Sequence, residues 1–108
     1  MRAIAFAILA ATAAGAALGQ PPACRAIDGD TIRCGAETIR LRRVYAAELR
    51  EPGGPEAKAR LQALLESGTV TLERSGARSH GRTLAHVYVD GRRIVQRDIG
   101  PRAGKGSR

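Results

Sequence analysis

Four residues that are widely separated along the chain carry the functional groups that phosphodiester chemistry requires. Two are carboxylates, Asp30 and Glu48, and two are arginines, Arg40 and Arg82. A carboxylate beside a turn can hold a hard cation, and a guanidinium can bind two phosphate oxygens at once. A second carboxylate can accept a proton from an attacking water. These residue types therefore predict a site for a phosphate ester, provided that the fold brings them together.

Each of these residues also has a purely structural explanation. Asp28-Gly29 is a common hairpin turn, which the Asp28 side chain would support by bonding to the backbone. The two arginines could be charges on strand faces that pair with Glu37 or Glu48. Glu48 follows a predicted strand, so it could equally be a solvated surface residue. Single motifs do not decide between these alternatives.

The elements that must position these residues are mainly strands. Alternating apolar residues and turn signals predict strands over residues 23–28, 31–34, 37–44, 69–73, 82–89 and 92–95. This alternation directs Arg40 away from the core. Apolar residues at helical spacing predict a helix over residues 55–67, with Pro55 in its first turn and Gly68 as a stop signal. Three strands, a helix and further strands is the order of a small Greek-key barrel of the OB type.

Aromatic residues are scarce, so we expect an aliphatic core. Its expected members are Ile27, Ile32, Ile39, Leu41, Val44, Leu61, Leu64, Leu65, Val70, Leu72, Leu84, Val87, Val89 and Ile94.

Several motifs in order resemble the staphylococcal nuclease (thermonuclease) family. They are Ala-Ile-Asp-Gly-Asp-Thr-Ile at 26–32, Ile-Arg-Leu at 39–41, Glu48, and the Gly-Arg step that opens residues 81–91. The resemblance covers about residues 24–98, and the ordered set is far more specific than any one motif. It implies a five-stranded OB-fold barrel with one helix, in a short form that lacks the C-terminal helix usual in the family.

The resemblance also implies roles for individual residues. Asp30 matches the main metal-binding carboxylate, and Arg40 matches the arginine that holds the phosphate. Glu48 matches the carboxylate that acts on the attacking water. Arg82 matches the arginine opposite the charge that develops on the leaving oxygen. His80 replaces an aromatic residue before the Gly-Arg step and could contact a nucleotide.

Tyr45 is the main departure from the family pattern, because it stands where a second calcium-binding Asp is expected. A neutral phenol is a poor ligand for a hard divalent cation. A Ca²⁺ ion would then depend on Asp30, the backbone carbonyl of Ala46, water and substrate phosphate. Two hypotheses follow: a calcium-dependent nuclease with a weakened metal site, or a catalytically impaired relative that binds single-stranded nucleic acid or nucleotides. A structural or partner-binding envelope protein is a third alternative.

The first 19 residues have the composition of a secretory signal peptide. One arginine precedes an apolar, Ala- and Gly-rich run that ends in small residues. We therefore expect residues 1–19 to be a signal peptide, 20–99 the nuclease-like domain and 100–108 a disordered basic tail. The protein would be secreted or periplasmic, monomeric and without stable membrane association after cleavage. An uncleaved membrane anchor is the alternative.

Arginine dominates the charge of the chain. The formal net charge is +8, and all but two of the 18 basic residues are arginine. Arginine favours planar, bidentate contacts with phosphate, so a polyanionic partner such as DNA or RNA fits this balance. A solvated surface rich in arginine through genome composition explains the charge equally well.

The two cysteines, Cys24 and Cys34, lie on either side of the Asp28-Gly29 turn. If the flanking segments form a hairpin, the two positions come close to facing one another, and an exported chain can keep a disulfide there. We expect a Cys24–Cys34 disulfide. Two free, buried thiols are the alternative.

Overall fold

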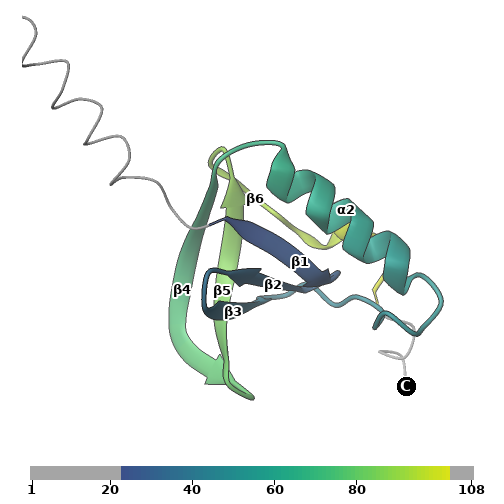
Figure 1. Ribbon diagram of the computed structural model, residues 1–108, viewed down its shortest axis with the longest axis horizontal. Helices are drawn as coiled ribbons and strands as arrows, with labels where there is room; N and C mark the ends of the chain where they lie inside the picture. Colours follow the sequence, from purple (N-terminus) through teal and green to yellow (C-terminus); the bar gives the residue numbers. More distant parts are fainter. Residues whose placement is uncertain (1–22, 103–108) are drawn as a thin grey trace, which may run out of the picture.

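The computed structural model describes residues 23–102, so the predicted signal peptide and the end of the predicted basic tail lie outside the described residues. Figure 1 shows a curved sheet with one main helix beside it. The elements in chain order are β1 (Cys24–Asp28), β2 (Thr31–Cys34), β3 (Glu37–Leu41), α2 (Gly54–Glu66), β4 (Val70–Ser79), β5 (Arg82–Val89), β6 (Arg92–Arg93) and α3 (Gln96–Ile99). No helix within residues 23–102 is both long and apolar enough to cross a membrane.

The sheet has the strand order β1-β2-β3-β5-β4, and β6 pairs with Tyr88 and Val89 at the end of β5. β1, β2 and β3 form an antiparallel meander, whereas β3 and β5 run parallel. β1 and β4 are the two ends of this order, so the sheet curls without closing. The predicted mainly β, OB-like fold with one helix is confirmed, with an open sheet in place of a closed barrel.

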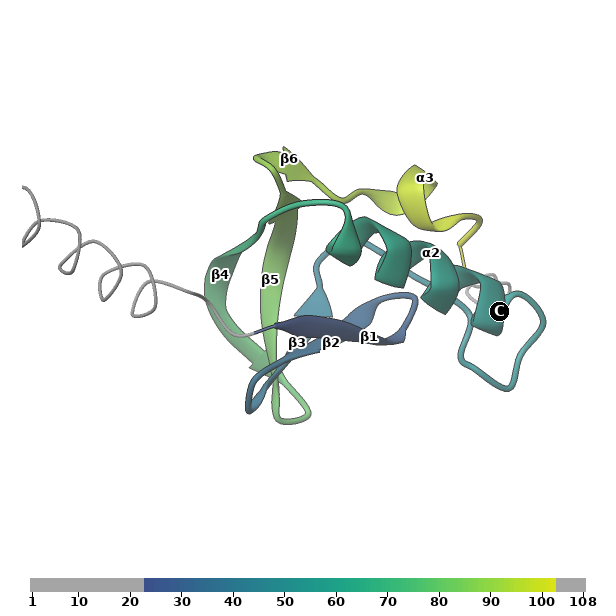
Figure 2. The ribbon, with the colours of Figure 1, turned by 45° about the horizontal axis from the view of Figure 1, so that its top comes forward.

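Helix α2 lies against β1, as both ribbon views show (Figures 1 and 2). It follows Gly53, which adopts a left-handed conformation, and Pro55 occupies its first turn as the sequence predicted. Ala57, Leu61 and Leu65 form its buried face. The spacing of these residues places them on one side of the helix, which packs against β1 and α3.

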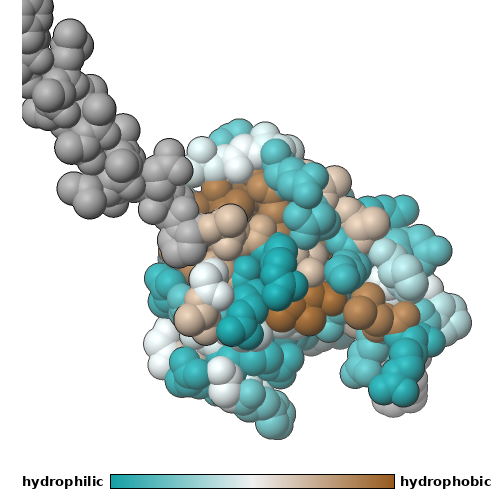
Figure 3. Space-filling view, viewed as in Figure 1, coloured by the Kyte–Doolittle hydropathy of each residue, from teal (hydrophilic) through white to brown (hydrophobic). Residues whose placement is uncertain are grey.

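The core is aliphatic, as expected from the sequence. Eight of the expected members are buried: Ile32, Ile39, Leu41, Val44, Leu61, Leu65, Val87 and Ile94. Small residues contribute more than expected, because Ala26, Ala46, Ala57 and Ala85 are also buried. Ile99 is a further buried residue that was not expected from the sequence. Four further expected members are half-buried and pack against this core: Leu64, Val70, Leu72 and Val89. Ile27 and Leu84 are half-buried and do not belong to this cluster, so their assignment to the core was wrong. In Figure 3 apolar surface shows between α2 and the β4–β5 pair, surrounded by hydrophilic side chains.

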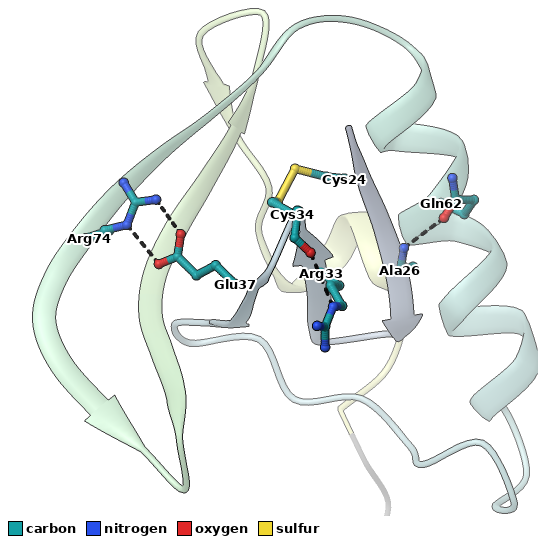
Figure 4. Close-up of a disulfide and its surroundings, with 8 residues drawn as sticks. Cys24, Ala26, Arg33, Cys34, Glu37, Gln62 and Arg74 are labelled. Atoms are coloured by element: carbon teal, nitrogen blue, oxygen red, sulfur yellow. Dashed lines mark hydrogen bonds and ion pairs between the residues drawn. A yellow bond between two sulfur atoms is a disulfide. The ribbon is translucent and has the colours of Figure 1, made fainter. Parts of the chain in front are cut away.

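The predicted Cys24–Cys34 disulfide is present and joins β1 to β2 (Figure 4). The two cysteines are direct partners in the antiparallel register, so the bond closes the open end of the hairpin. On the outer side of β1, the Gln62 side chain of α2 accepts a hydrogen bond from the Ala26 N–H at 2.8 Å. The first strand is therefore held on both sides.

Two sharp hairpins flank β5. Asp90-Gly91 has positive φ at both residues, as this dipeptide predicts, and His80-Gly81 has the same geometry between β4 and β5. β4 is longer than predicted because it continues past Glu73 to Ser79, with a register irregularity between Arg74 and Arg78. Only Arg92–Arg93 of the predicted last strand is extended with a partner.

A short helix, α3, follows instead of further strand. The backbone N–H groups at the start of a helix have no partners within the helix. Here the Asp98 carboxylate accepts a hydrogen bond from the Val95 N–H at 2.8 Å. This helix brings Ile99 into the core against α2, where the Arg60 side chain donates to the Ile99 carbonyl. The end of the described chain is thereby held beside the loop that follows β3.

Candidate functional site

The Asp30 carboxylate is the centre of a small hydrogen-bond network at the end of the first hairpin. The Asp28 side chain accepts the N–H of Asp30 at 3.0 Å, which fixes the turn. One oxygen of Asp30 accepts the Thr31 hydroxyl at 3.0 Å, and the other accepts the Ala46 N–H at 3.0 Å. Asp30 therefore links the hairpin turn to the loop after β3, sixteen residues away.

Gly29 allows this close approach. A Cβ atom at this position would lie 2.5 Å from the Ala46 Cβ and 2.6 Å from the Ala57 Cβ. Both distances are far below van der Waals contact, so any larger residue would push the turn away from the loop and from α2. The glycine is needed for packing, and the position of Asp30 depends on it.

Asp28 and Asp30 bring two carboxyl groups together. Burial raises the pKa of Asp28 above its ordinary value, and the neighbouring Asp30 carboxyl adds to the rise. Two adjacent carboxylates repel each other, and positive charge placed beside them relieves this repulsion. The electrostatics of the turn therefore favour a cation or a guanidinium at Asp30.

The Arg40 side chain supplies such a charge. Its guanidinium lies 3.4 Å from the Asp30 carboxylate, and it also donates a hydrogen bond to the Leu41 carbonyl. The Arg40 side chain is 18% exposed, so the pair is partly shielded from water. Its neighbours Ile39 and Leu41 are buried in the core, which confirms that Arg40 points to the other face of β3.

Arg40 and Arg82 line a single surface pocket of about 530 Å³. The parallel pairing of β3 with β5 explains why, because Arg40 is the register partner of Leu84. Arg82 lies two residues before Leu84, on the same face of β5. The Arg82 Nε donates to the Ser79 carbonyl at 3.1 Å, which leaves its terminal nitrogens for other contacts. Among residues 23–102, the lining residues are Arg40, Leu41, Arg42, Arg43, Tyr45, Ser79, Arg82 and Leu84.

Tyr45 forms one wall of this pocket and is 41% exposed. The Arg40 guanidinium lies 5.5 Å from the centre of its ring, and that of Arg102 lies 4.3 Å away. The Gln96 side chain holds the Tyr45 backbone from both sides, since it accepts the N–H at 2.8 Å and donates to the carbonyl at 3.1 Å. Sequence reasoning missed Gln96 and Arg102, because neither lies in a recognisable motif.

Glu48 is not brought into the same pocket. It is exposed on the loop between β3 and α2, and its N–H donates to the Glu51 carboxylate at 3.0 Å. A Cβ at Gly54 would lie 2.0 Å from the Glu48 carbonyl, so the start of α2 packs directly on this backbone. The loop is therefore held at Ala46, by Asp30, and at Glu48, by Gly54.

His80 lies at the rim of the site and does not line the pocket. It occupies the tight turn between β4 and β5 with φ of 54°, and it is exposed. Its Nδ1 is 3.2 Å from the hydroxyl of Ser79, which does line the pocket. Of the site residues predicted from the sequence, Arg40, Tyr45 and Arg82 line the pocket, and Asp30 contacts Arg40 and Ala46. Glu48 and His80 do not line it.

The donor atoms at the turn fit a hard cation only weakly. Ca²⁺ takes six to eight oxygen ligands, preferably with several carboxylates. Within residues 23–102 no three acidic, histidine or cysteine side chains gather in a way that could hold a metal ion. Asp30 and its neighbour Asp28 are the acidic groups at this position, and Tyr45 contributes a phenol packed against guanidinium groups.

Two endonucleases of Bacillus subtilis (strain 168) are similar to this chain. The SPbeta prophage-derived endonuclease YokF is 36% identical over 85 residues, and the endonuclease YncB is 39% identical over 85 residues. Each match covers 67% of this chain, but the chain spans only 29% and 40% of the length of these relatives. No protein-family model matches the chain.

Proposed function

We propose that this protein is an exported nuclease of the staphylococcal nuclease-like type, which hydrolyses phosphodiester bonds of DNA or RNA. The main support is that Arg40 and Arg82, from two parallel strands, line one pocket beside the Asp30 carboxylate. The similarity to two endonucleases supports the same reaction class. The composition of residues 1–19 and the disulfide support export to a secreted or periplasmic location.

The two arginines would bind the scissile phosphate and spread its charge. In the attack, a water oxygen bonds to phosphorus, the ester P–O bond breaks, and the leaving oxygen takes a proton from solvent. Glu48 would accept the proton that the attacking water loses. Arg82 can place charge-assisted hydrogen bonds on the leaving oxygen, because only its Nε is engaged by the protein backbone.

A calcium ion would be held by Asp30 and the Ala46 carbonyl, with the remaining positions taken by water and substrate. When bound, it supplies a positive charge that polarises the phosphoryl oxygens. The small number of acidic ligands predicts weak binding, in which the substrate phosphate completes the site. Asp30 also has a structural role, because it accepts the Ala46 N–H and so fixes the loop that carries Tyr45 and Ala46.

The test is calcium-dependent release of acid-soluble nucleotides from single-stranded DNA and from RNA by the purified chain. Chelation should abolish release, and Glu48→Gln should lower the rate by about 10²- to 10⁴-fold, the usual contribution of a general base. Glu56→Gln is the matched control, because Glu56 is exposed on the first turn of α2. Unchanged hydrolysis by Glu48→Gln would remove Glu48 from the mechanism.

Two observations favour a second function. Glu48 does not line the arginine pocket, and the pocket is lined by Tyr45, a phenol at the position where the family resemblance implies a metal-binding Asp. In this alternative the protein is a catalytically impaired relative that binds single-stranded nucleic acid or nucleotides as a monomer. It predicts salt-sensitive binding without turnover, weakened by Arg40→Ala and Arg82→Ala. A wild-type chain that neither cleaves nor binds oligonucleotides at low salt would exclude both functions.

A further inference from the structure

We propose that Tyr45 is a stacking platform for an unpaired nucleobase, and that a nucleic-acid strand crosses it from the arginine pocket into a second basic pocket. This inference rests on the proposed function, because it requires a nucleic-acid ligand. The inference adds a binding subsite at Tyr45, the position where the family resemblance implies a metal-binding Asp.

The second pocket lies on the other side of Tyr45. It has a volume of about 640 Å³, and Val95, Gln96, Arg97, Gly100, Pro101 and Arg102 line it. Tyr45 lines the first pocket, and two lining residues of the second contact it: Gln96 binds the Tyr45 backbone and the Arg102 guanidinium packs on the ring. A continuous path therefore runs from β3 and β5 over Tyr45 to α3.

The charge along this path suits a polyanion. In the part of the chain that the structure describes, four arginines line the first pocket and two line the second, and no acidic side chain lines either one. A phosphate in the arginine pocket leaves the next nucleotide free to extend toward Arg97 and Arg102. Positive charge on both sides of an aromatic ring is the arrangement that binds single strands, whose bases are free to stack.

Tyr45 is well suited to stacking because its backbone is fixed while its ring remains exposed. The bidentate contact with Gln96 removes backbone freedom that a ligand would otherwise have to restrict. In the structure the ring is packed against Arg102, a cation–π contact. An incoming base would take the place of this guanidinium, which then becomes available to the flanking phosphate.

The test compares a short single-stranded oligothymidylate with an abasic oligonucleotide of the same length, in the presence of chelator so that no cleavage occurs. Loss of the bases should weaken binding to the wild type by about ten-fold, since one stacked base contributes this much. Tyr45→Ala should bind the two oligonucleotides equally, whereas Tyr45→Phe should keep the preference for bases. Arg102→Gln should lower the salt dependence by about 0.7 in the log–log slope, as for one lost phosphate contact on a single strand.

Tyrosine fluorescence gives an independent readout, because the chain has two tyrosines and no tryptophan. Stacking on Tyr45 should quench the emission, and Tyr45→Phe should remove this quenching while affinity is kept. Arg25→Gln is the matched control for Arg102→Gln, because Arg25 is exposed on β1 and lines neither pocket.

The possible failures are distinguishable. If the wild type binds oligonucleotides but Tyr45→Ala keeps the preference for bases, the platform is refuted and the proposed function stands. Quenching that persists in Tyr45→Phe would place the base at Tyr88 and refute the platform equally. If the wild type binds neither oligonucleotide, the proposed function fails together with this inference.

Discussion

Substitution of Gly29 by alanine should damage the fold and the site together. The added Cβ would lie 2.5 Å and 2.6 Å from the Cβ atoms of Ala46 and Ala57, which cannot rotate away. Overpacking of this kind costs about 1–3 kcal/mol. The displaced turn would also strain the Asp30–Ala46 hydrogen bond. Hydrogen bonds to charged groups contribute about 1.5–3 kcal/mol, and part of this would be lost. We expect a total loss of about 3 kcal/mol in the free energy of unfolding.

Urea denaturation followed by far-UV circular dichroism measures this loss, which corresponds to a fall in Tm of roughly 10–20 °C for a domain of this size. The second variant is Gly29→Ala combined with Ala57→Gly, which removes one of the two clashing atoms and should recover part of the stability. Gly29→Ala alone within about 0.5 kcal/mol of the wild type would refute the reasoning, because a tightly packed turn cannot absorb the atom at that cost.

Two other perturbations test the interactions that hold the sheet. Arg74 is the main cause that holds the pKa of Glu37 at about 2, below the ordinary value of 4.5, so its contribution to stability is complete above pH 4.5 and is lost as the pH falls toward 2. Because Arg74 is half exposed and the pair is screened by water, we expect this contribution of Glu37 to be small. Glu37→Gln should remove it from the acid side of a stability–pH profile, and an unchanged profile would contradict this. Reduction of the Cys24–Cys34 disulfide should lower the free energy of unfolding by about 2–3 kcal/mol, because the unfolded chain loses a loop constraint. The double variant Cys24→Ala/Cys34→Ala should have the same effect. Urea denaturation measures the loss, and equal midpoints with and without the disulfide would show that the crosslink is dispensable.

Local sequence patterns predicted the elements and the direction of several side chains. The alternation in residues 37–41 placed Arg40 outside the core, and Asp90-Gly91 predicted a hairpin with positive φ at both residues. The facing positions of Cys24 and Cys34 followed from the hairpin around the Asp28-Gly29 turn. These features depend on neighbours within about ten residues, and such short-range geometry can be read from the chain.

Long-range pairing could not be predicted in this way. The convergence of Arg40 with Arg82 depends on the parallel register of β3 and β5, which no local pattern specifies. The contact between Tyr45 and Gln96 joins residues 51 apart, and it depends on α3 replacing the expected strand. Without α3, Ile99 could not be recognised as a core residue.

The place of Glu48 could not be predicted from the order of the motifs. Its order in the sequence matches a role on the attacking water, and the structure places it on an exposed loop that does not line the arginine pocket. The loop path is set by contacts with Gly54 and Glu51, which are ordinary residues in the sequence. A shared order of residue types therefore does not specify the path of the loop between β3 and α2.

β1 and β4, the ends of the strand order, present edges that could pair with another molecule, and the chain protects these two edges differently. On β1, Gln62 occupies the Ala26 N–H, so a foreign strand would have to displace a helix side chain. On β4, Arg74 and Arg78 flank an irregular segment in which Gly76 has φ of 89°. Charge and a distorted backbone both oppose growth of the sheet from this edge. Each end of the open sheet thus carries a feature that disfavours pairing with a foreign strand.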